Sequence, residues 1–400
     1  MRKGTISTPA PPAKAEKTTR NKLYKLHTWV GFHLAFLMSL ILFTGTFATI
    51  SNEIDWLIQS DMRVSPQGER ISWGKLEAIA LNYRPGHTIS SISHMKSDYF
   101  AYRARMIDEY GKGYFLHINQ WTGEVTGTSP TLTVQRFFRD IHRYLFMPNF
   151  IGLPLVTSFA FILAISLYTG LKTTRKWGAA ATRIRFHKQA RVVVGDVHRM
   201  AGIWSIWFFV LMIMTSLWYL AEFGSYIVQS PFEPERPEVT DERVQAYGPA
   251  VRYADADTLV KAAKTAYPEL EPRIIFYPFN AKGAVMVLGR NNDVLIRDRA
   301  NRVFLDPVDA SIIKVQRAED ISWAAYLNEM ADPLHFGYFG GLGTKLIWFI
   351  FGLAMTGLSI SGVWLTWKRL KTVTISRAQF ATMPVLFLMM LAGVFWYERQ

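Results

Sequence analysis

Residues 346–367 read LIWFIFGLAMTGLSISGVWLTW, 22 consecutive positions without a charged side chain. A helix needs about 20 apolar residues to cross a bilayer core about 30 Å thick, so this stretch predicts a membrane span. Four further stretches have a similar length and character: 29–50, 150–171, 202–221 and 380–396. With half of the chain hydrophobic and clustered in such runs, an ordinary soluble globule is excluded. Five crossings place the two ends of the chain on opposite sides of a membrane.

The distribution of charge predicts the orientation. The chain carries 45 basic and 31 acidic residues, a net charge of +14. Segments 1–28, 172–197 and 368–377 together hold 18 basic and 2 acidic residues, which leaves 27 basic and 29 acidic in the rest. The positive-inside rule therefore places these three segments in the cytoplasm and segments 51–141 and 222–340 outside. Because membrane topology explains the positive charge, that charge gives no reason to expect a nucleic-acid partner.

The absence of cysteine limits the chemistry. A chain without cysteine has no disulfide, thiolate metal site, iron–sulfur cluster or cysteine nucleophile. The sequence also contains no Walker loop, no GxGxxG fingerprint and no HExxH motif. A bound metal would therefore depend on histidine, carboxylate or a cofactor, and electrons would have to come from a partner or from quinol.

Two pairs of histidine motifs indicate an internal repeat. LHTWVG at 26–31 matches VHRMAG at 197–202, each before a span that starts on the cytoplasmic side. IHRY at 141–144 matches LHFG at 334–337, each before a span that starts on the outer side. The pattern predicts two copies of a unit made of a helix, an outer segment and a second helix, followed by a fifth helix.

The two outer segments have similar patterns. In each, a helical pattern precedes stretches of alternating polar and apolar residues that are typical of strands. The expected helices are 73–83 and 257–266, and the expected strands are 99–106, 114–119, 273–277, 284–289 and 301–305. Each outer segment is therefore predicted to be a small α+β domain.

The repeated histidines are candidate metal ligands. His27 and His198 would lie at the cytoplasmic level on opposed helices, and His142 and His335 at the outer level. A neutral imidazole is a natural iron ligand, so each pair can hold one haem through two axial bonds. Gly31 and Gly202 follow His27 and His198 by four residues, where a missing side chain leaves room for a flat macrocycle.

Other interpretations of the histidines stay open. A single histidine at a membrane edge is often a polar interfacial residue and not a ligand. His33 lies about 240° around the helix from His27, so it faces elsewhere and is a second-choice ligand. The remaining four, His87, His94, His117 and His187, fall in predicted loops or strands and are expected to have no catalytic part.

The sequence resembles the PepSY-associated transmembrane helix family, which includes inner-membrane ferrisiderophore reductases. The marks of the resemblance are LHFG at 334–337 with Gly340 and Gly341, the helix starts at His27 and His198, FLHIN at 115–119 with TGE at 122–124, and VFLDP at 303–307. The second outer segment departs from the pattern, since VDA at 308–310 stands where the first has TGE. The resemblance implies haem b, electron transfer across the membrane and an outward-facing reductive site.

These observations together predict a mainly α membrane protein. The fold class is an internally repeated four-helix transmembrane bundle plus a fifth helix, with two small α+β PepSY-like domains on the periplasmic side of a bacterial inner membrane. The expected organisation is a cytoplasmic basic tail 1–28, a span 29–50, a first periplasmic domain 51–141, an interfacial segment and span 142–171, a basic loop 172–197, a span 198–221, a second periplasmic domain 222–334, an interfacial segment and span 335–367, a cytoplasmic loop 368–379 and a fifth span 380–400.

The leading functional hypothesis is a haem b-dependent ferric-chelate reductase. Two haems held by His27/His198 and by His142/His335 would carry electrons from a cytoplasmic or quinol donor to a ferric siderophore and reduce Fe(III) to Fe(II). One alternative is a haem-free membrane protein whose outer domains bind a ligand or restrain a peptidase. Another keeps the haems but passes electrons to an acceptor other than a siderophore.

Overall fold

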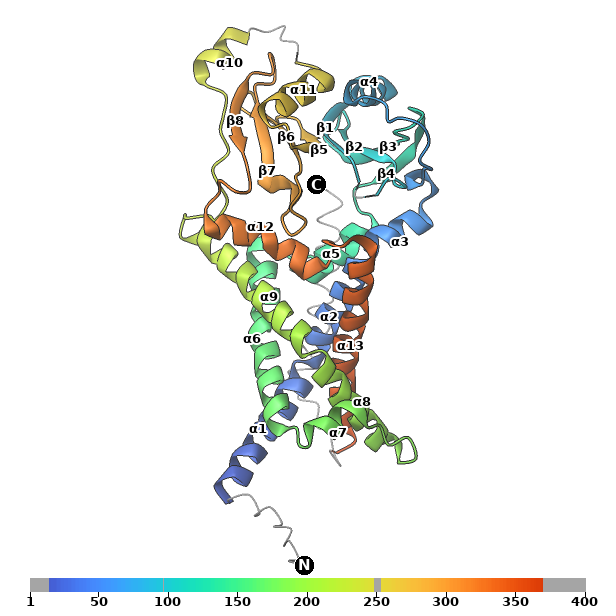
Figure 1. The fold of residues 1–400 in the computed structure, drawn as a ribbon, viewed down its shortest axis with the longest axis vertical. Coiled ribbons are helices and arrows are strands. Elements are labelled where there is room, and N and C mark those ends of the chain that lie inside the picture. Colours follow the sequence, from blue (N-terminus) through green and yellow to red (C-terminus); the bar gives the residue numbers. More distant parts are fainter. Residues whose placement is uncertain (1–13, 96, 248–252, 370–400) are drawn as a thin grey trace, which may run out of the picture.

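The computed structural model describes residues 14–95, 97–247 and 253–369. The predicted fifth span 380–400, the start of the basic tail and most of the loop 368–379 lie outside the described residues. In the described part, apolar helices form one end of an elongated molecule and a β-sheet with its covering helices forms the other (Figure 1).

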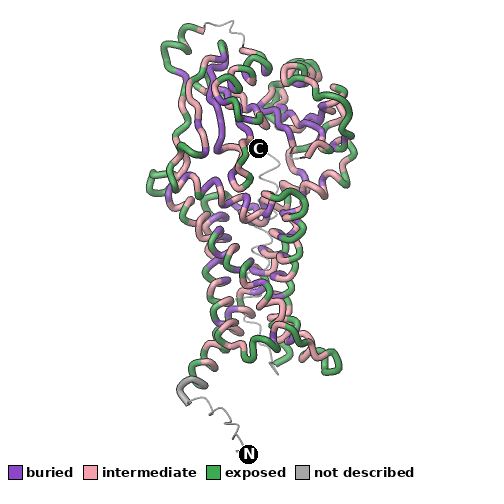
Figure 2. The backbone as a smooth tube through the Cα atoms, viewed as in Figure 1, coloured by how far each residue is buried: buried purple, intermediate pink, exposed green. Residues whose placement is uncertain are grey.

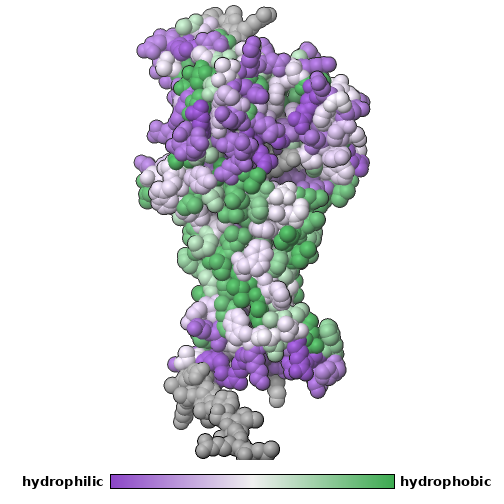
Figure 3. Space-filling model, viewed as in Figure 1, coloured by the Kyte–Doolittle hydropathy of each residue, from purple (hydrophilic) through white to green (hydrophobic). Residues whose placement is uncertain are grey.

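Three helices are long and apolar enough to cross a membrane individually within the described residues. They are α6 (Asn149–Thr173), α9 (Ile206–Ile227) and α13 (Gly341–Trp367). A fourth crossing exists only if α1 (Lys14–His33) and α2 (Ala35–Thr49) are taken together as one bent span. Figure 3 shows a hydrophobic surface around this region, between two hydrophilic ends. The structure thus has the surface that a bilayer requires.

The predicted fold class, a repeated bundle of four spanning helices, is wrong. The first predicted span, 29–50, is not one helix, because α1 and α2 meet at Leu34 with a bend of 69°. Leu34 has φ −102° and ψ 3°, outside helical values, and the His33 ring donates from Nδ1 to the Trp29 carbonyl over 2.9 Å. Apolar residues continue on both sides of Leu34, so composition alone did not reveal the break.

A second break lies before α9. The helix α8 (Ala190–Trp204) ends where Ser205, with φ −91° and ψ 4°, separates it from α9. This break follows His198 by seven residues, and the break at Leu34 follows His27 by seven residues. Each histidine-bearing helix is therefore set apart from the apolar helix that follows it.

The strands of both outer segments form one sheet, which the sequence did not predict. The strand order is β4-β3-β2-β1-β5-β6-β7-β8, and all neighbours are antiparallel. The two halves join where Ser91, Ile92 and Ser93 of β1 pair with Phe276, Ile275 and Ile274 of β5. The strands are β1 (Thr88–Ser93), β2 (Tyr102–Ile107), β3 (Gly113–Ile118), β4 (Val125–Pro130), β5 (Glu271–Phe276), β6 (Val285–Arg290), β7 (Asn301–Leu305) and β8 (Ile312–Gln316).

One helix packs on each half of the sheet. The helix α4 (Trp73–Tyr83) is capped by Ser72, and α11 (Ala256–Ala266) by Asp255, whose side chains accept from backbone N–H groups three residues on. Both helices bury apolar residues at i and i+4, Leu76 with Ala80 and Leu259 with Ala263. The buried parts of the sheet are purple in Figure 2. The predicted helices 73–83 and 257–266 are confirmed by α4 and α11.

Three shorter helices connect the sheet to the membrane helices: α3 (Ser51–Ile58), α5 (Val134–Tyr144) and α12 (Trp323–Phe336). The buried Asp55 carboxylate of α3 accepts from the backbone N–H groups of Val134 and Gln135, which fixes the start of α5. The helices α5 and α12 both end at a left-handed residue, Leu145 with φ 53° and Gly337 with φ 69°. These two helices carry His142 and His335 and lie across the outer end of the membrane region (Figure 1).

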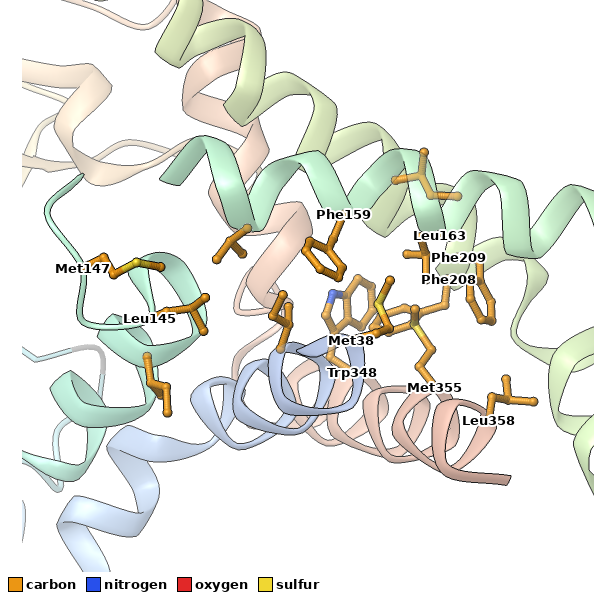
Figure 4. Packing of buried hydrophobic residues seen from close by; sticks show 14 of the residues in the cluster. Met38, Leu145, Met147, Phe159, Leu163, Phe208, Phe209, Trp348, Met355 and Leu358 are labelled. Atoms are coloured by element: carbon orange, nitrogen blue, oxygen red, sulfur yellow. The ribbon is translucent and has the colours of Figure 1, made fainter. Parts of the chain in front are cut away.

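The membrane helices pack around an apolar core. The helix α2 runs along α13, and α6 runs along α9. Figure 4 shows Met38, Phe159 and Trp348 of three different helices in the space between them. Smaller elements complete the described chain: η1 (Ser60–Met62), α7 (Trp177–Thr182), α10 (Asp241–Tyr247) and η2 (Asp298–Ala300).

Candidate functional site

The structure brings the two histidines of each predicted pair together. At the end of the bundle near α7, His27 of α1 faces His198 of α8, with ring centroids 6.4 Å apart and ring planes at 81°. At the end near the sheet, His142 of α5 faces His335 of α12, with centroids 6.1 Å apart and planes at 36°. We refer to these as the inner pair and the outer pair. All four rings are partly buried.

In the inner pair, Nδ1 of each ring is held by a neighbouring helix. Nδ1 of His27 lies 3.1 Å from the Ser166 carbonyl and 3.0 Å from the Thr169 hydroxyl of α6. Nδ1 of His198 lies 2.8 Å from the Ser361 hydroxyl of α13. A carbonyl only accepts, and the Ser361 hydroxyl already donates to the Leu358 carbonyl, so the proton of each ring is on Nδ1.

In the outer pair, Nδ1 is held in the same way. Nδ1 of His142 donates to the Ile41 carbonyl of α2 over 2.8 Å. Nδ1 of His335 lies 2.8 Å from the Thr215 hydroxyl of α9, which itself donates to the Leu211 carbonyl. Among the described residues, no hydrogen bond engages Nε2 of any of the four rings. The lone pair of Nε2 is therefore available, and an Nδ1–H bond of this kind is what orients a metal-binding imidazole.

Glycines of neighbouring helices make room for three of the rings. A Cβ at Gly45 of α2 would lie 2.5 Å from Cε1 of His142. At Gly170 of α6 and Gly362 of α13, a Cβ would lie 3.5 Å from Cε1 of His27 and 3.6 Å from Cε1 of His198, respectively. The close approach at Gly45 excludes any larger residue unless the ring moves.

A cavity adjoins each pair. The inner cavity has a volume of about 960 Å³, and its lining includes His27, His198, Gly31 and Gly202. The outer cavity, lined by His142 and His335, has a volume of about 120 Å³. The inner one is as large as the largest common small-molecule sites, whereas the outer one is smaller than such sites. A macrocycle can thus enter the inner cavity as it stands, and the outer one must widen.

Three methionines line the outer cavity. Its lining includes Met38, Met212 and Met355, and methionine is the apolar side chain that adapts best to a new shape. Met38 and Met355, together with Leu42 and Leu163, line both cavities. The two spaces are thus separated by a thin layer of flexible apolar side chains.

The spacing of the two rings in each pair suits two imidazoles bound to one iron, but only the inner cavity has the volume for a porphyrin. With metal–imidazole bonds of about 2 Å and ring nitrogens about 1 Å from the ring centre, two axial imidazoles have centroids about 6 Å apart. The observed 6.4 and 6.1 Å agree with this separation. The described residues contain no group of three or more potential metal ligands, so a bare metal ion would be underligated in either pair. An iron that brings most of its ligands in a cofactor would need only the two imidazoles that each pair offers.

The remaining histidines lie apart from both cavities. His33 is exposed and stacks on Trp29, with centroids 4.9 Å apart. His94 and His117 are buried in the first outer segment, 51–141. Burial and nearby arginines lower the pKa of each to about 4. His87 bonds to the Tyr114 hydroxyl, and His187 is exposed in the loop after α7.

Sequence reasoning missed the residues that hold the four imidazoles. Thr169, Ser361 and Thr215 lie on helices far along the chain from the rings they contact. A partial signal was present, because Ser166 to Gly170 and Ser359 to Gly362 are similar segments at the ends of two spans. No comparable pattern pointed to Gly45.

Comparison with protein families gives a match over most of the chain. Residues 24–369 match the model described as PepSY-associated TM region. Among curated proteins, no match was found. The matched segment contains all four histidines of the inner and outer pairs and the whole sheet. The chain therefore belongs to the PepSY-associated TM region family of membrane proteins.

Proposed function

We propose that this protein is a haem b-dependent oxidoreductase of the bacterial inner membrane, which passes electrons outward to reduce a ferric siderophore. The observation that carries the proposal is the arrangement of the two histidine pairs at opposite ends of the membrane helices, each with Nδ1 anchored and Nε2 unengaged. Two such pairs in one chain would hold two haems.

The proposed orientation rests on charge. The inner pair lies beside the loop around α7, a segment with seven basic residues and one acid between positions 172 and 197. Under the positive-inside rule this end is cytoplasmic, so the sheet and the outer pair are periplasmic. A cytoplasmic or quinol donor would then deliver electrons at the His27/His198 end.

The proposed route runs along the helices. Bound haem supplies reversible one-electron chemistry at its iron. The protein holds the two sites at a fixed separation, because Gly362 lines the inner cavity and Gly352, ten residues earlier on α13, lines the outer one, a rise of about 15 Å. The apolar layer of Met38, Leu42, Leu163 and Met355 keeps water out of the space between them.

The proposed substrate follows from coordination chemistry. Hydroxamate and catecholate chelators are hard oxygen ligands and hold Fe(III) much more tightly than the softer Fe(II). Transfer of one electron to the chelated iron therefore loosens the complex without breaking a covalent bond of the chelator. The helices that carry the outer pair lie just below the sheet (Figure 1). A chelate bound at the sheet would therefore be close to His142 and His335.

The haem count tests the cofactor. Full-length protein purified in detergent should give close to two haems per chain in a pyridine haemochrome assay, with a low-spin spectrum typical of two imidazole ligands. A colourless, iron-free preparation would contradict the proposal and leave a haem-free binding protein or a peptidase-restraining protein.

Stopped-flow reoxidation tests the acceptor. Protein reduced with dithionite should be reoxidised faster by a ferric hydroxamate or catecholate than in buffer alone. The matching gallium(III) chelate is the control, since it has the same shape and charge but takes no electron. If no ferric chelate accelerates reoxidation while a quinone or an oxidised protein does, the acceptor is not a siderophore.

A further inference from the structure

Within the part of the chain that the structure describes, two arginines at the outer cavity bond to no carboxylate. Arg139 and Arg143 stand four residues apart on α5, on either side of His142, and both line the cavity of the outer pair. Residues at i and i+4 lie on the same helix face, about 6 Å apart. In the described residues neither guanidinium makes a hydrogen bond or an ion pair with a carboxylate, although Arg143 stacks on Tyr144.

The nearby carboxylates bond to other groups, although Oδ1 of Asp140 has no hydrogen-bond partner among the described residues. Asp140 pairs with Arg136 over 2.6 Å. Asp332, which also lines the cavity, accepts from Arg297 over 2.8 Å and from the Tyr219 hydroxyl over 2.7 Å. Among the described residues, neither cavity-lining arginine therefore has a carboxylate bonded to its guanidinium. Charges at a partly buried, low-dielectric site are costly unless they are paired, which points to an anionic ligand.

The proposed cofactor has the matching charge. Haem carries two carboxylate groups, its propionates, on one edge of the macrocycle, and guanidinium binds carboxylate through two parallel N–H···O bonds. Both arginines come from the helix that carries His142, so they are placed with the ring that would bind iron. The helix α5 lies at the end of the membrane region next to the sheet, where a charged edge can stay close to water (Figure 1).

From this arrangement we infer that Arg139 and Arg143 form the carboxylate-binding edge of the outer site and hold the two propionates of its haem. The inference rests on the proposed function and adds two positioning residues to it. The same anion-binding chemistry would suit the headgroup of an acidic phospholipid, so the test separates the two sources.

The test compares haem with haem dimethyl ester, in which both propionates are neutral. Full-length protein with His27→Ala is used, so that only the outer pair binds the added haem. Affinity is measured from the haem absorbance. Esterification should weaken binding about 100-fold, and Arg139→Gln and Arg143→Gln should each weaken haem binding about tenfold. The two glutamine variants should bind the ester with the same affinity as the parent protein, because the ester has no free carboxylate for either arginine to contact.

Controls separate charge loss from loss of contact. Arg105→Gln removes one charge from an exposed position of β2 and should leave both affinities unchanged. Arg139→Lys keeps the charge but not the bidentate geometry. Its affinity for haem should lie between those of the parent protein and of Arg139→Gln. Comparison of haem and its ester on the parent protein needs no arginine substitution, so it remains informative if an arginine variant does not fold.

The outcomes distinguish this inference from the proposed function. If the ester binds as tightly as haem, or if the arginine variants weaken both ligands equally, the arginines do not hold propionates. If the variants lose only a preference for vesicles of acidic phospholipid over neutral ones, the ligand is a lipid headgroup. Either result overturns this inference and leaves the two-haem proposal standing, whereas a protein that binds no haem overturns both.

Discussion

Gly45 of α2 and His142 of α5 are in contact so close that a methyl group on Gly45 would lie 2.5 Å from Cε1 of the imidazole. The same helix supplies the Ile41 carbonyl that accepts from Nδ1 of His142. One turn of α2 therefore fixes both the position and the tautomer of this ring. The outer pair depends on the backbone of α2 as well as on its own helices.

Replacing Gly45 with alanine should displace the His142 ring. The added methyl cannot be accommodated unless the imidazole moves, which breaks the Nδ1 bond to Ile41. We expect Gly45→Ala to reduce haem content from two to about one per chain, measured as pyridine haemochrome. Gly357→Ala is the matched control, because a Cβ there meets nothing within 4 Å and alanine favours the helix by about 0.5–1 kcal/mol.

Removing His335 should remove one haem. The variant His335→Ala leaves His142 without its facing imidazole, so we expect about half of the haem to be lost and outward reduction of ferric chelates to stop. His33→Ala should keep both haems, because that ring is exposed and stacks on Trp29, away from the inner cavity. Loss of haem from the His33 variant, with retention in a His27→Ala variant, would show that the inner ligands are assigned wrongly.

The Thr215 hydroxyl should tune the outer site without being a ligand. Thr215→Val keeps the shape of the side chain but removes the acceptor for Nδ1 of His335. Loss of such a supporting bond typically lowers metal affinity 10- to 100-fold. We expect weaker haem retention and a changed midpoint potential in a redox titration. Thr265→Val on α11 is a suitable control, since its hydroxyl bonds to the Lys261 carbonyl of its own helix and it lines neither cavity. An unchanged potential in the Thr215 variant would argue against axial ligation by His335.

The outer segments should lose stability as the pH falls from about 6.5 to 4. Burial lowers the pKa of His94 and of His117 to about 4, so in this window the unfolded chain binds protons that the folded chain does not. Stability therefore rises with pH between these values, by up to about 3 kcal/mol for each histidine.

Denaturation of the full-length protein at several pH values measures this slope. His117→Gln keeps a donor for the Ser129 hydroxyl but does not titrate, so it should reduce the slope by about half. His187→Gln, at an exposed position of the loop after α7, should leave the slope unchanged. A slope that is equal in all three proteins would contradict the assignment.

The sequence predicted the longest apolar helices, the helices α4 and α11 and five of the eight described strands, but neither the other strands nor the junctions between elements. Long apolar runs locate α6, α9 and α13, because hydrophobic length is a property of the chain itself. The break at Leu34 lies inside a continuous apolar run, so no apolar pattern records it. Likewise, the pairing of β1 with β5 joins residues more than 180 positions apart, and alternation within a strand does not identify its partner.

For the candidate site, the sequence indicated the imidazoles but not their supports. His27, His198, His142 and His335 could be paired because the motifs around them repeat, and the structure brings both pairs together. The groups that fix Nδ1 are common hydroxyls and a backbone carbonyl, which have no distinctive pattern. Only the packing of helices selects them.

The junction between β1 and β5 also bears on what happens if the chain is cut or truncated. In the intact protein these two strands hydrogen-bond to each other. The free edges of the sheet are therefore β4, which ends in Pro130, and β8. A fragment that ends in the loop around α7 would leave β1 without its partner, and the complementary fragment would expose Ile274, Ile275 and Phe276 of β5. Exposed strand edges of this kind recruit other chains, so each fragment alone is expected to aggregate, whereas the two fragments produced together can restore the pairing of β1 with β5.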